Sequence, residues 1–324
     1  MPPYSERYGG VVLSTTIDKY AYCTVTRNPK SGYSLRSADQ ELLEIYPNLR
    51  SLKYNGKLDL GKAVIKTVRG PGSRSLEMSL LSEAPPGSGL GSSSALMVSA
   101  IRAVSDFLNM HKSSYSIAEL AFELERNELG IKGGYQDQFA STFGGFNFME
   151  FGSGGVKITP LRLKNEILQE LLLSLVLIDT GRSRLSSNIL SRQINSYLRE
   201  DALVMENLAA MKQLTVEMKT SLLQGDIAGL AELVGKEWVC KKRLDKMITN
   251  SQIDTIYKNS LKRGAMGGKV LGAGDGGHML FFVDFKKKRE LTKYLASIGN
   301  VPISFNFDDR GVCGWKVENN TVLV

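Results

Sequence analysis

The chain carries the sequence PPGSGLGSSSA at residues 85–95, and this stretch decides how the rest is interpreted. It places three glycines and a run of three serines directly before an amphipathic segment that predicts a helix over residues 93–108. Glycine lets the main chain approach an anion without a clashing side chain, and the start of a helix offers unpaired N–H groups and the positive end of its dipole. The serine hydroxyls add donors, or ligands for the magnesium that accompanies a nucleotide. The stretch therefore predicts a polyphosphate site.

This loop matches neither of the two commonest glycine fingerprints. It lacks the Gly-Lys-Ser/Thr ending of the P-loop, and its glycines at 87, 89 and 91 do not give the G-x-G-x-x-G spacing of a dinucleotide fold. The alternative is that the small residues only cap the helix, but a single cap residue would be enough for that purpose. The number of small and turn-forming residues favours phosphate binding.

Length and composition are those of a globular protein of about two domains. The chain has 324 residues, of which 42% are hydrophobic, so it can bury a full core. It contains no apolar run of about 18 residues and no secretory leader pattern, which predicts a cytoplasmic protein without a membrane partner. Its three cysteines show no C-x-x-C spacing, which argues against disulfides and zinc.

The net charge of +8 raises the question of nucleic acid binding. The basic residues are spread along the chain and interleaved with acidic ones, so no single basic stripe is expected. The longest basic cluster, at residues 286–289, begins a predicted surface helix and is typical of a solvated face. A modest positive field also suits an enzyme whose ligands are phosphorylated.

Apolar periodicity predicts an α+β architecture. The elements expected in the first half are strands at residues 10–17, 20–27, 75–82 and 144–151 and helices at residues 93–108 and 116–129. The second of these helices is expected to begin with Ser116 as N-cap and Glu119 completing a capping box. The elements expected later are strands at residues 171–178, 269–272, 278–283, 302–307 and 314–324 and helices at residues 186–223, 226–244, 252–263 and 286–298. The predicted domains are residues 1–168 and 169–324.

Several segments of the chain resemble the GHMP kinases, the family that includes galactokinase and the homoserine, mevalonate and phosphomevalonate kinases. Residues 86–93 are similar to the family's central ATP-binding motif, and residues 269–277 are similar to its C-terminal glycine-rich motif. ERNELG at 125–130 and GGYQDQFAS at 133–141 resemble its metal and catalytic segments. The resemblance covers nearly the whole chain. It implies a two-lobed kinase, with an N-terminal β-rich domain and a C-terminal ferredoxin-like domain, that uses ATP and Mg²⁺.

Within the family, QDQ at 136–138 and FGGFN at 143–147 are most similar to the sugar-1-kinase branch. That similarity implies phosphorylation of the anomeric hydroxyl of a heptose 7-phosphate to the 1,7-bisphosphate. The alternatives are a kinase for another sugar, such as fucose or galactose, and a non-catalytic nucleotide-binding relative. The expected partner is a small sugar phosphate rather than nucleic acid, and the expected assembly is a monomer or homodimer. Family members also begin with a Pro-x-Arg strand and a Gly-Gly-Gly-Thr-Asp turn, and this strand is expected to be missing here.

The resemblance also implies site residues. Asp137 would orient or deprotonate the attacking sugar hydroxyl, while Ser93 and Glu125 would bind Mg²⁺. The nucleotide would be bound by Pro86, Gly87, Ser88, Gly89, Leu90, Gly91, Ser92 and Ser93. The residues expected on the substrate side are Gly134, Gln136, Arg182, Arg184, Gly274, Asp275 and Gly276.

Some of these assignments have ordinary alternatives. Arg182 and Arg184 are expected to clamp the 7-phosphate because a forked guanidinium matches a phosphate dianion. Asp275 stands where relatives often carry glycine, and its carboxylate is expected to face sugar hydroxyls or solvent. Taken alone, Glu125 would be interpreted as a surface charge and Asp137 as a helix N-terminal cap.

Overall fold

The computed structural model describes residues 2–69, 75–181, 187–318 and 321–323. The chain forms two compact units, each assembled from several segments. Unit 1 comprises residues 1–15, 86–90 and 145–307, and unit 2 comprises residues 16–85, 91–144 and 308–324. Residues 168 and 169 both lie in unit 1, so these units and the predicted sequence domains divide the chain differently. Among the described residues, no helix is both long and apolar enough to span a bilayer.

Unit 2 is built on a four-stranded sheet in the order β2-β5-β3-β4, in which only the β3/β5 pair is parallel. Its strands are β2 (Ala21–Arg27), β3 (Tyr33–Ser37), β4 (Leu42–Tyr46) and β5 (Leu76–Ser82), with a hairpin of β12 (Lys316–Glu318) and β13 (Thr321–Leu323). Its helices are η1 (Leu49–Ser51), α2 (Asp59–Thr67), α3 (Ser92–Phe107), α4 (Ser114–Glu123), the π-helical turn η2 (Leu124–Glu128) and α5 (Gln136–Phe143).

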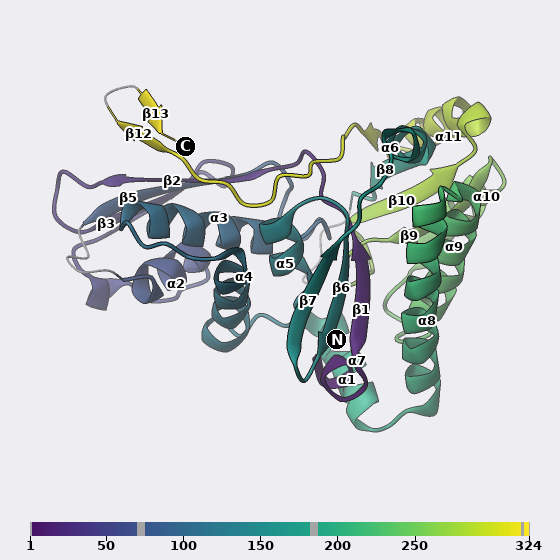
Figure 1. Ribbon diagram of the computed structural model, residues 1–324, viewed down its shortest axis with the longest axis horizontal. Helices are drawn as coiled ribbons and strands as arrows, with labels where there is room; N and C mark the ends of the chain where they lie inside the picture. The colour runs from purple at the N-terminus through teal and green to yellow at the C-terminus, as the bar shows by residue number, and fades with distance from the viewer. Residues whose placement is uncertain (1, 70–74, 182–186, 319–320, 324) are drawn as a thin grey trace. The chain divides into compact units, whose positions relative to one another are not determined.

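The core of unit 2 lies between this sheet and α3 (Figure 1). Alternate residues of β5, including Met78 and Leu80, point inward and are almost fully buried, as their period-2 pattern predicts. They belong to the same buried cluster as Met97 and Ile101 of α3. This packing fixes α3, and therefore the position of its first turn.

Unit 1 contains an antiparallel sheet in the order β11-β8-β10-β9. The strands are β8 (Leu175–Asp179), β9 (Ala265–Val270), β10 (His278–Val283) and β11 (Pro302–Ile303), and a second sheet pairs β1 (Gly10–Ser14), β6 (Asn147–Gly152) and β7 (Gly155–Pro160). The helices are α1 (Pro2–Tyr8), α6 (Asn165–Ser174), α7 (Ser187–Leu198), α8 (Ala202–Gln224), α9 (Ile227–Lys242), α10 (Ser251–Leu261) and α11 (Phe285–Ser297).

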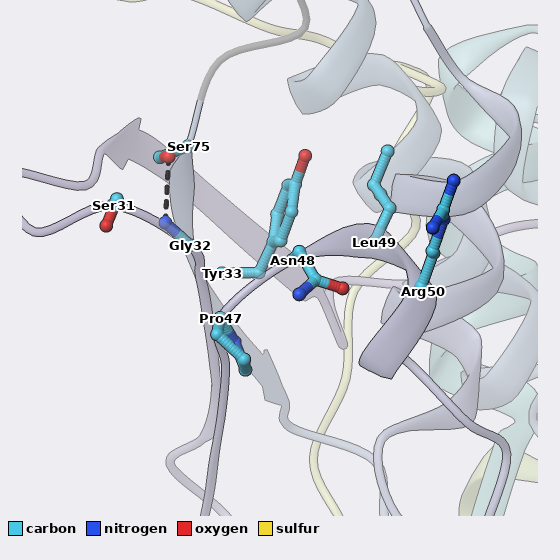
Figure 2. Close-up of a pocket in the computed structure, with 8 residues that line it drawn as sticks. All are labelled: Ser31, Gly32, Tyr33, Pro47, Asn48, Leu49, Arg50 and Ser75. Carbon is cyan, nitrogen blue, oxygen red and sulfur yellow. Dashed lines mark hydrogen bonds between the residues drawn. The ribbon is translucent and has the colours of Figure 1, made fainter.

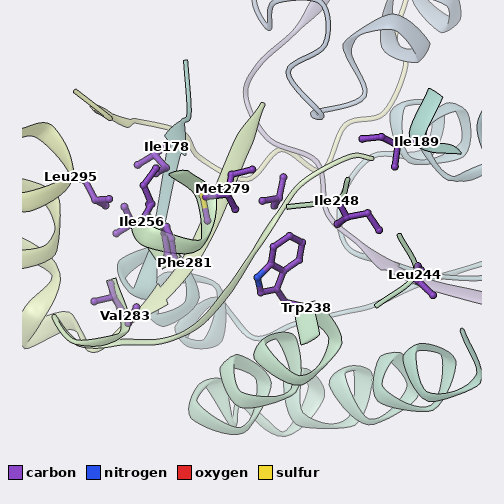
Figure 3. Packing of buried hydrophobic residues seen from close by; sticks show 14 of the residues in the cluster. Ile178, Ile189, Trp238, Leu244, Ile248, Ile256, Met279, Phe281, Val283 and Leu295 are labelled. Atoms are coloured by element: carbon purple, nitrogen blue, oxygen red, sulfur yellow. The ribbon is translucent and has the colours of Figure 1, made fainter. Parts of the chain in front are cut away.

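The strand order of the four-stranded sheet in unit 1 is that of a ferredoxin-like fold, with one helical connection before β9 and another after β10. The predicted ferredoxin-like architecture is therefore confirmed. Helices α8 and α9 run side by side, and α9 packs on β9 (Figure 1). Trp238 of α9 is fully buried in a cluster with Met279 and Phe281 of β10 (Figure 3). This core anchors the loop that joins β9 to β10.

Several predicted elements have different bounds. The apolar run 171–178 is the end of α6 followed by β8, and the predicted helix 186–223 is two helices, α7 and α8. The predicted last strand, 314–324, contains the β12/β13 hairpin. The prediction of Ser116 as a helix cap is wrong, because α4 begins earlier and the side chain of Ser113 accepts the hydrogen bond from the backbone N–H of Ser116.

A buried lysine stabilises the edge of the unit 2 sheet. The Lys62 side chain has no exposed surface, and its Nζ lies 2.8 Å from Glu44 Oε2 and 3.0 Å from Asp59 Oδ1. It also donates to Asn55 Oδ1 at 2.6 Å and to the Lys53 carbonyl at 3.1 Å. The ammonium therefore ties β4 to α2 through several charge-assisted bonds.

We expect Lys62→Met to lower the free energy of unfolding by about 2 kcal/mol, because the change leaves two partly buried carboxylates without their cation. Urea denaturation would measure this as a lower midpoint with an unchanged m-value. Lys236→Met is the matched control, since the partner Glu232 and Lys236 itself are both largely exposed. Equal midpoints for the two variants would contradict a stabilising role for Lys62.

Candidate active site

The first half of the predicted phosphate loop, residues 86–90, lies in unit 1 against the loop between β9 and β10. Gly89 has a left-handed φ of +77°, and a Cβ added there would lie 2.8 Å from the carbonyl oxygen of Leu271. A Cβ added to Gly272 would lie 2.7 Å from the Cα of Gly89. The two glycine-rich loops therefore meet backbone to backbone, a contact that leaves no room for side chains.

His278, the first residue of β10, bonds to the same loop. Its backbone N–H donates to the carbonyl of Ser88 at 3.0 Å, and its ring Nδ1 lies 2.8 Å from that oxygen. Because a carbonyl can only accept, this contact requires the proton on Nδ1. His278 is almost fully buried. It therefore fixes the orientation of the Ser88 peptide, a role that its position in the sequence did not suggest.

Lys241, on α9, holds the second loop from another side. Its Nζ donates to the carbonyl of Val270 at 3.1 Å and to that of Gly272 at 2.6 Å. Burial, together with repulsion by Lys269, lowers the pKa of Lys241 below its ordinary value. The two hydrogen bonds of this amine fix the end of β9, next to the contact between Gly89 and Gly272. Nothing in the sequence singled out this lysine.

The second half of the phosphate loop belongs to unit 2 and leads into α3. Gly91 is the N-cap of α3, with a left-handed φ of +77°, and no side chain caps the helix. The Ser92 hydroxyl donates to the Pro85 carbonyl at 3.3 Å, while Ser93 is exposed. A helix start whose first amides are not taken by a side-chain cap is a suitable binding site for a phosphate.

Asp137 lies in the first turn of α5, beside the last glycine of this loop. A Cβ added to Gly91 would lie 3.4 Å from the Cβ and 3.5 Å from the Cγ of Asp137. Burial raises the pKa of Asp137, and this effect outweighs the hydrogen bond from Gln136 and the charge of Arg126, which both lower it. The structure thus places a carboxylate with raised proton affinity next to the start of α3.

Glu125 lies on the π-helical turn η2 and is 1% exposed, so it is not the surface charge that its sequence context alone would suggest. Its Oε2 accepts hydrogen bonds from Ser94 Oγ, at 3.1 Å, and from Gln138 Nε2, and it lies 3.4 Å from a guanidinium nitrogen of Arg126. Its Oε1 is buried and has no hydrogen-bond partner among the residues that the structure describes. Burial raises the pKa of Glu125 despite the attraction of Arg126.

Ser94, which sequence reasoning did not select, is thus the serine that contacts Glu125, and its neighbour Ser93 is exposed. Successive helical residues are rotated by about 100°, so the hydroxyls of Ser93 and Ser94 leave the helix in different directions. The run of three serines was the available signal, but it did not distinguish between them.

Comparison with known proteins gives the family of this chain. Residues 59–145 match the model of the GHMP kinase N-terminal domain. The chain is 39% identical over 318 residues to the D-glycero-alpha-D-manno-heptose 7-phosphate kinase of Campylobacter jejuni, covering 97% of this chain and 93% of that protein. The chain belongs to the GHMP kinase family. It is accordingly an ATP-dependent kinase of small molecules.

Further relatives agree with this assignment. The crystal structure of a D-glycero-D-manno-heptose 1-phosphate kinase from Bacteroides thetaiotaomicron has a TM-score of 0.81 and 31% identity, and the match covers 98% of this GHMP kinase and 94% of that chain. The bifunctional fucokinase/GDP-fucose pyrophosphorylase of Arabidopsis thaliana is 27% identical over 69% of this chain and 21% of its own length.

Of the other residues predicted on the substrate side of this GHMP kinase, the structure describes those between β9 and β10 but not the two arginines. Gly274 and Asp275 lie in the loop between β9 and β10, with the carboxylate of Asp275 accepting from Asn250 Nδ2 at 2.9 Å. Asp275 is 5% exposed, so it does not point into solvent, which was one of the two expected orientations. The neighbouring Gly276 has a positive φ, as Gly274 does. Arg182 and Arg184 lie outside the described residues.

A pocket elsewhere in unit 2 is separate from these residues. This cavity has a volume of about 540 Å³ and lies where β3 and β5 begin. Figure 2 shows the residues that line it. Its lining residues are Ser31, Gly32, Tyr33, Pro47, Asn48, Leu49, Arg50 and Ser75. Since no predicted site residue is among them, this pocket is not the candidate active site.

Proposed function

We propose that this GHMP kinase transfers the γ-phosphoryl group of ATP to the anomeric hydroxyl of D-glycero-D-manno-heptose 7-phosphate, forming the 1,7-bisphosphate. The observation that carries the proposal is the 39% identity to the Campylobacter jejuni heptose 7-phosphate kinase along nearly the full length of both chains. The fucokinase match is weaker and covers only 69% of this chain. A fucose or galactose kinase is therefore the less favoured assignment.

The nucleotide phosphates would bind along residues 86–93. Glycines at 87, 89 and 91 have left-handed φ values, which keep the main chain free of side chains on this path. The backbone amides at the start of α3 would then face the triphosphate, with the hydroxyls of Ser92 and Ser93 close by. Positioning and charge neutralisation are the main demands of phosphoryl transfer, and this loop meets the first of them.

Mg²⁺ would be held by Glu125 and Ser93. Among the described residues, the buried Oε1 of Glu125 has no hydrogen-bond partner. This fits a carboxylate oxygen whose partner in the working enzyme would be a metal ion. Ser94 and Gln138 would keep that carboxylate in place through its other oxygen. When bound, the metal would neutralise charge on the transferred phosphoryl group.

Asp137 would orient the anomeric hydroxyl and accept its proton. An anomeric hydroxyl is more acidic than an ordinary alcohol, so a single aspartate is a sufficient base. Gly134 and Gln136, which precede Asp137, would contact the sugar. The substrate contacts expected of Gly274 and Gly276 stay predictions from the sequence. The 7-phosphate clamp by Arg182 and Arg184 stays a prediction from the sequence.

We place this reaction in the cytoplasm, where it would supply nucleotide-activated heptose for surface polysaccharide, and we expect a monomer or homodimer. The test is a comparison of kcat/KM on heptose 7-phosphate, fucose and galactose with ATP and Mg²⁺, with the product position read by ³¹P NMR. Preference for a free sugar would overturn the substrate assignment. ADP release that is equal with and without any sugar would instead support a non-catalytic relative.

A further inference from the structure

Arg126 is a partly buried arginine in the π-helical turn η2, next to Glu125, with its side chain 13% exposed. One guanidinium nitrogen donates to the carbonyl of Ile131 at 2.8 Å, and the other donates to the carbonyl of Gly134 at 3.0 Å. Both carbonyls belong to the connection between η2 and α5. Arg126 therefore ties this connection to the turn that carries Glu125.

The guanidinium also lies against the backbone of Gly133. A Cβ added to Gly133 would be 2.4 Å from Nη2 and 2.7 Å from Cζ of Arg126. Gly133 does not have a left-handed φ, so its own backbone would accept alanine. An alanine at this position would therefore collide with the movable end of the arginine side chain and not with the turn.

Aromatic packing completes the arrangement. The Arg126 guanidinium lies 5.6 Å from the centroid of the Phe122 ring, and that ring stacks on Tyr135 with centroids 3.8 Å apart. Tyr135 immediately precedes α5. The connection from residue 131 to residue 135 is therefore held at its backbone by the guanidinium and at its end by a ring stack.

We propose that Arg126 is a positioning residue for phosphoryl transfer, which fixes the connection 131–135 so that Gly134, Gln136 and Asp137 face the sugar in a productive orientation. The inference rests on the proposed function of this site. An arginine suits this role because its planar fork satisfies two carbonyls at once, which a lysine ammonium on a single stem does not reproduce. Displacing such a support by about 1 Å is expected to cost up to about 100-fold in turnover.

The test uses four variants of the full chain: Gly133→Ala, Arg126→Lys, Arg126→Ala and the double variant Arg126→Ala/Gly133→Ala. Gly133→Ala should push the guanidinium away without removing its charge, and should lower kcat at least about tenfold. Arg126→Ala should lower kcat about 100-fold, and Arg126→Lys should restore it only in part. The KM for ATP should stay within about twofold of the parent in all four.

The double variant distinguishes positioning from general damage. Without the guanidinium, the added methyl group displaces nothing, so Gly133→Ala should cause no further loss in the Arg126→Ala background. Gly154→Ala is the control, because a Cβ there meets no atom within 4 Å and its φ is not left-handed. Thermal melting would show whether any variant is unfolded at the assay temperature, and Gly133→Ala keeps the test valid if Arg126→Ala does not fold.

The proposal is overturned if Gly133→Ala has the kcat of the parent, if the two losses multiply in the double variant, or if the KM for ATP changes as much as kcat. Its failure is separable from failure of the substrate assignment. The same four variants can be measured with whichever sugar the parent enzyme phosphorylates, and the expected coupling between Arg126 and Gly133 does not depend on that choice.

Discussion

Asp137→Asn should lower kcat by about 10²–10⁴-fold, the range typical of a lost general base, while ATP binding measured by calorimetry stays close to that of the parent. The amide keeps the size and helix position of the carboxylate but cannot accept the hydroxyl proton. Asp137 lies against Gly91 at the start of α3, and an amide of the same size fits that space. The loss should therefore appear in kcat and not in the melting temperature.

The pH dependence gives a second check. The active form of Asp137 is the carboxylate, and burial raises its pKa. Activity should therefore fall as the pH is lowered, beginning above the ordinary aspartate range. The part of this acid limb that belongs to Asp137 should disappear in Asp137→Asn, whereas the part from Glu125, whose pKa burial also raises, should remain. Asp254→Asn, at another aspartate in the first turn of a helix, is the control for a simple capping role. Similar kinetics for the two variants would show that Asp137 is only a helix cap.

Gly89→Ala should raise the KM for ATP at least about tenfold. Left-handed backbone costs a side-chain-bearing residue about 1–2 kcal/mol, and the added Cβ would also lie 2.8 Å from the Leu271 carbonyl oxygen. The neighbour is backbone and cannot rotate away, so the loop must leave the surface formed by Leu271 and Gly272. ATP titration of the variant should show the weakened binding directly.

The matched control is Gly152→Ala, at a glycine whose added Cβ would meet no atom within 4 Å. It should retain the parent's KM for ATP. If Gly89→Ala also binds ATP like the parent, the nucleotide does not bind along residues 86–93, and the assignment of this loop as the phosphate site is wrong.

Local periodicity predicted much of the fold. The alternation in β5 and the uninterrupted apolar stretch of β10 were sufficient to place both strands. The prediction of a single strand at residues 171–178 was wrong, because an apolar run does not distinguish the end of a helix from a buried strand. Here the run contains both. Strands β3 and β4 were not predicted. Each is only five residues long, and they depend on pairing, β3 with β5 and β4 with β3.

Site residues that lie in recognisable sequence motifs could be predicted. Site residues that act through contacts distant in the sequence could not. Asp137 and Glu125 followed from the resemblance to known kinases, and their roles stay predictions. His278 contacts Ser88 across 190 positions in the chain, and Lys241 reaches backbone carbonyls that no pattern of side chains reveals. Arg126 stood inside a recognised segment, but its proposed role rests on contacts with the connection to α5, at Ile131, Gly133 and Gly134, which the segment itself does not reveal.

The widened helical turn at residues 124–128 has a consequence for how this segment tolerates change. The N–H of Leu129 bonds to the carbonyl five positions earlier, so the turn holds one residue more than an α-helix would. Deleting Asn127 would restore ordinary helical spacing and rotate α4 by about 100° relative to the connection that leads to α5. Asn127 is exposed, so we expect a substitution there to cost little, whereas the length of the segment is constrained.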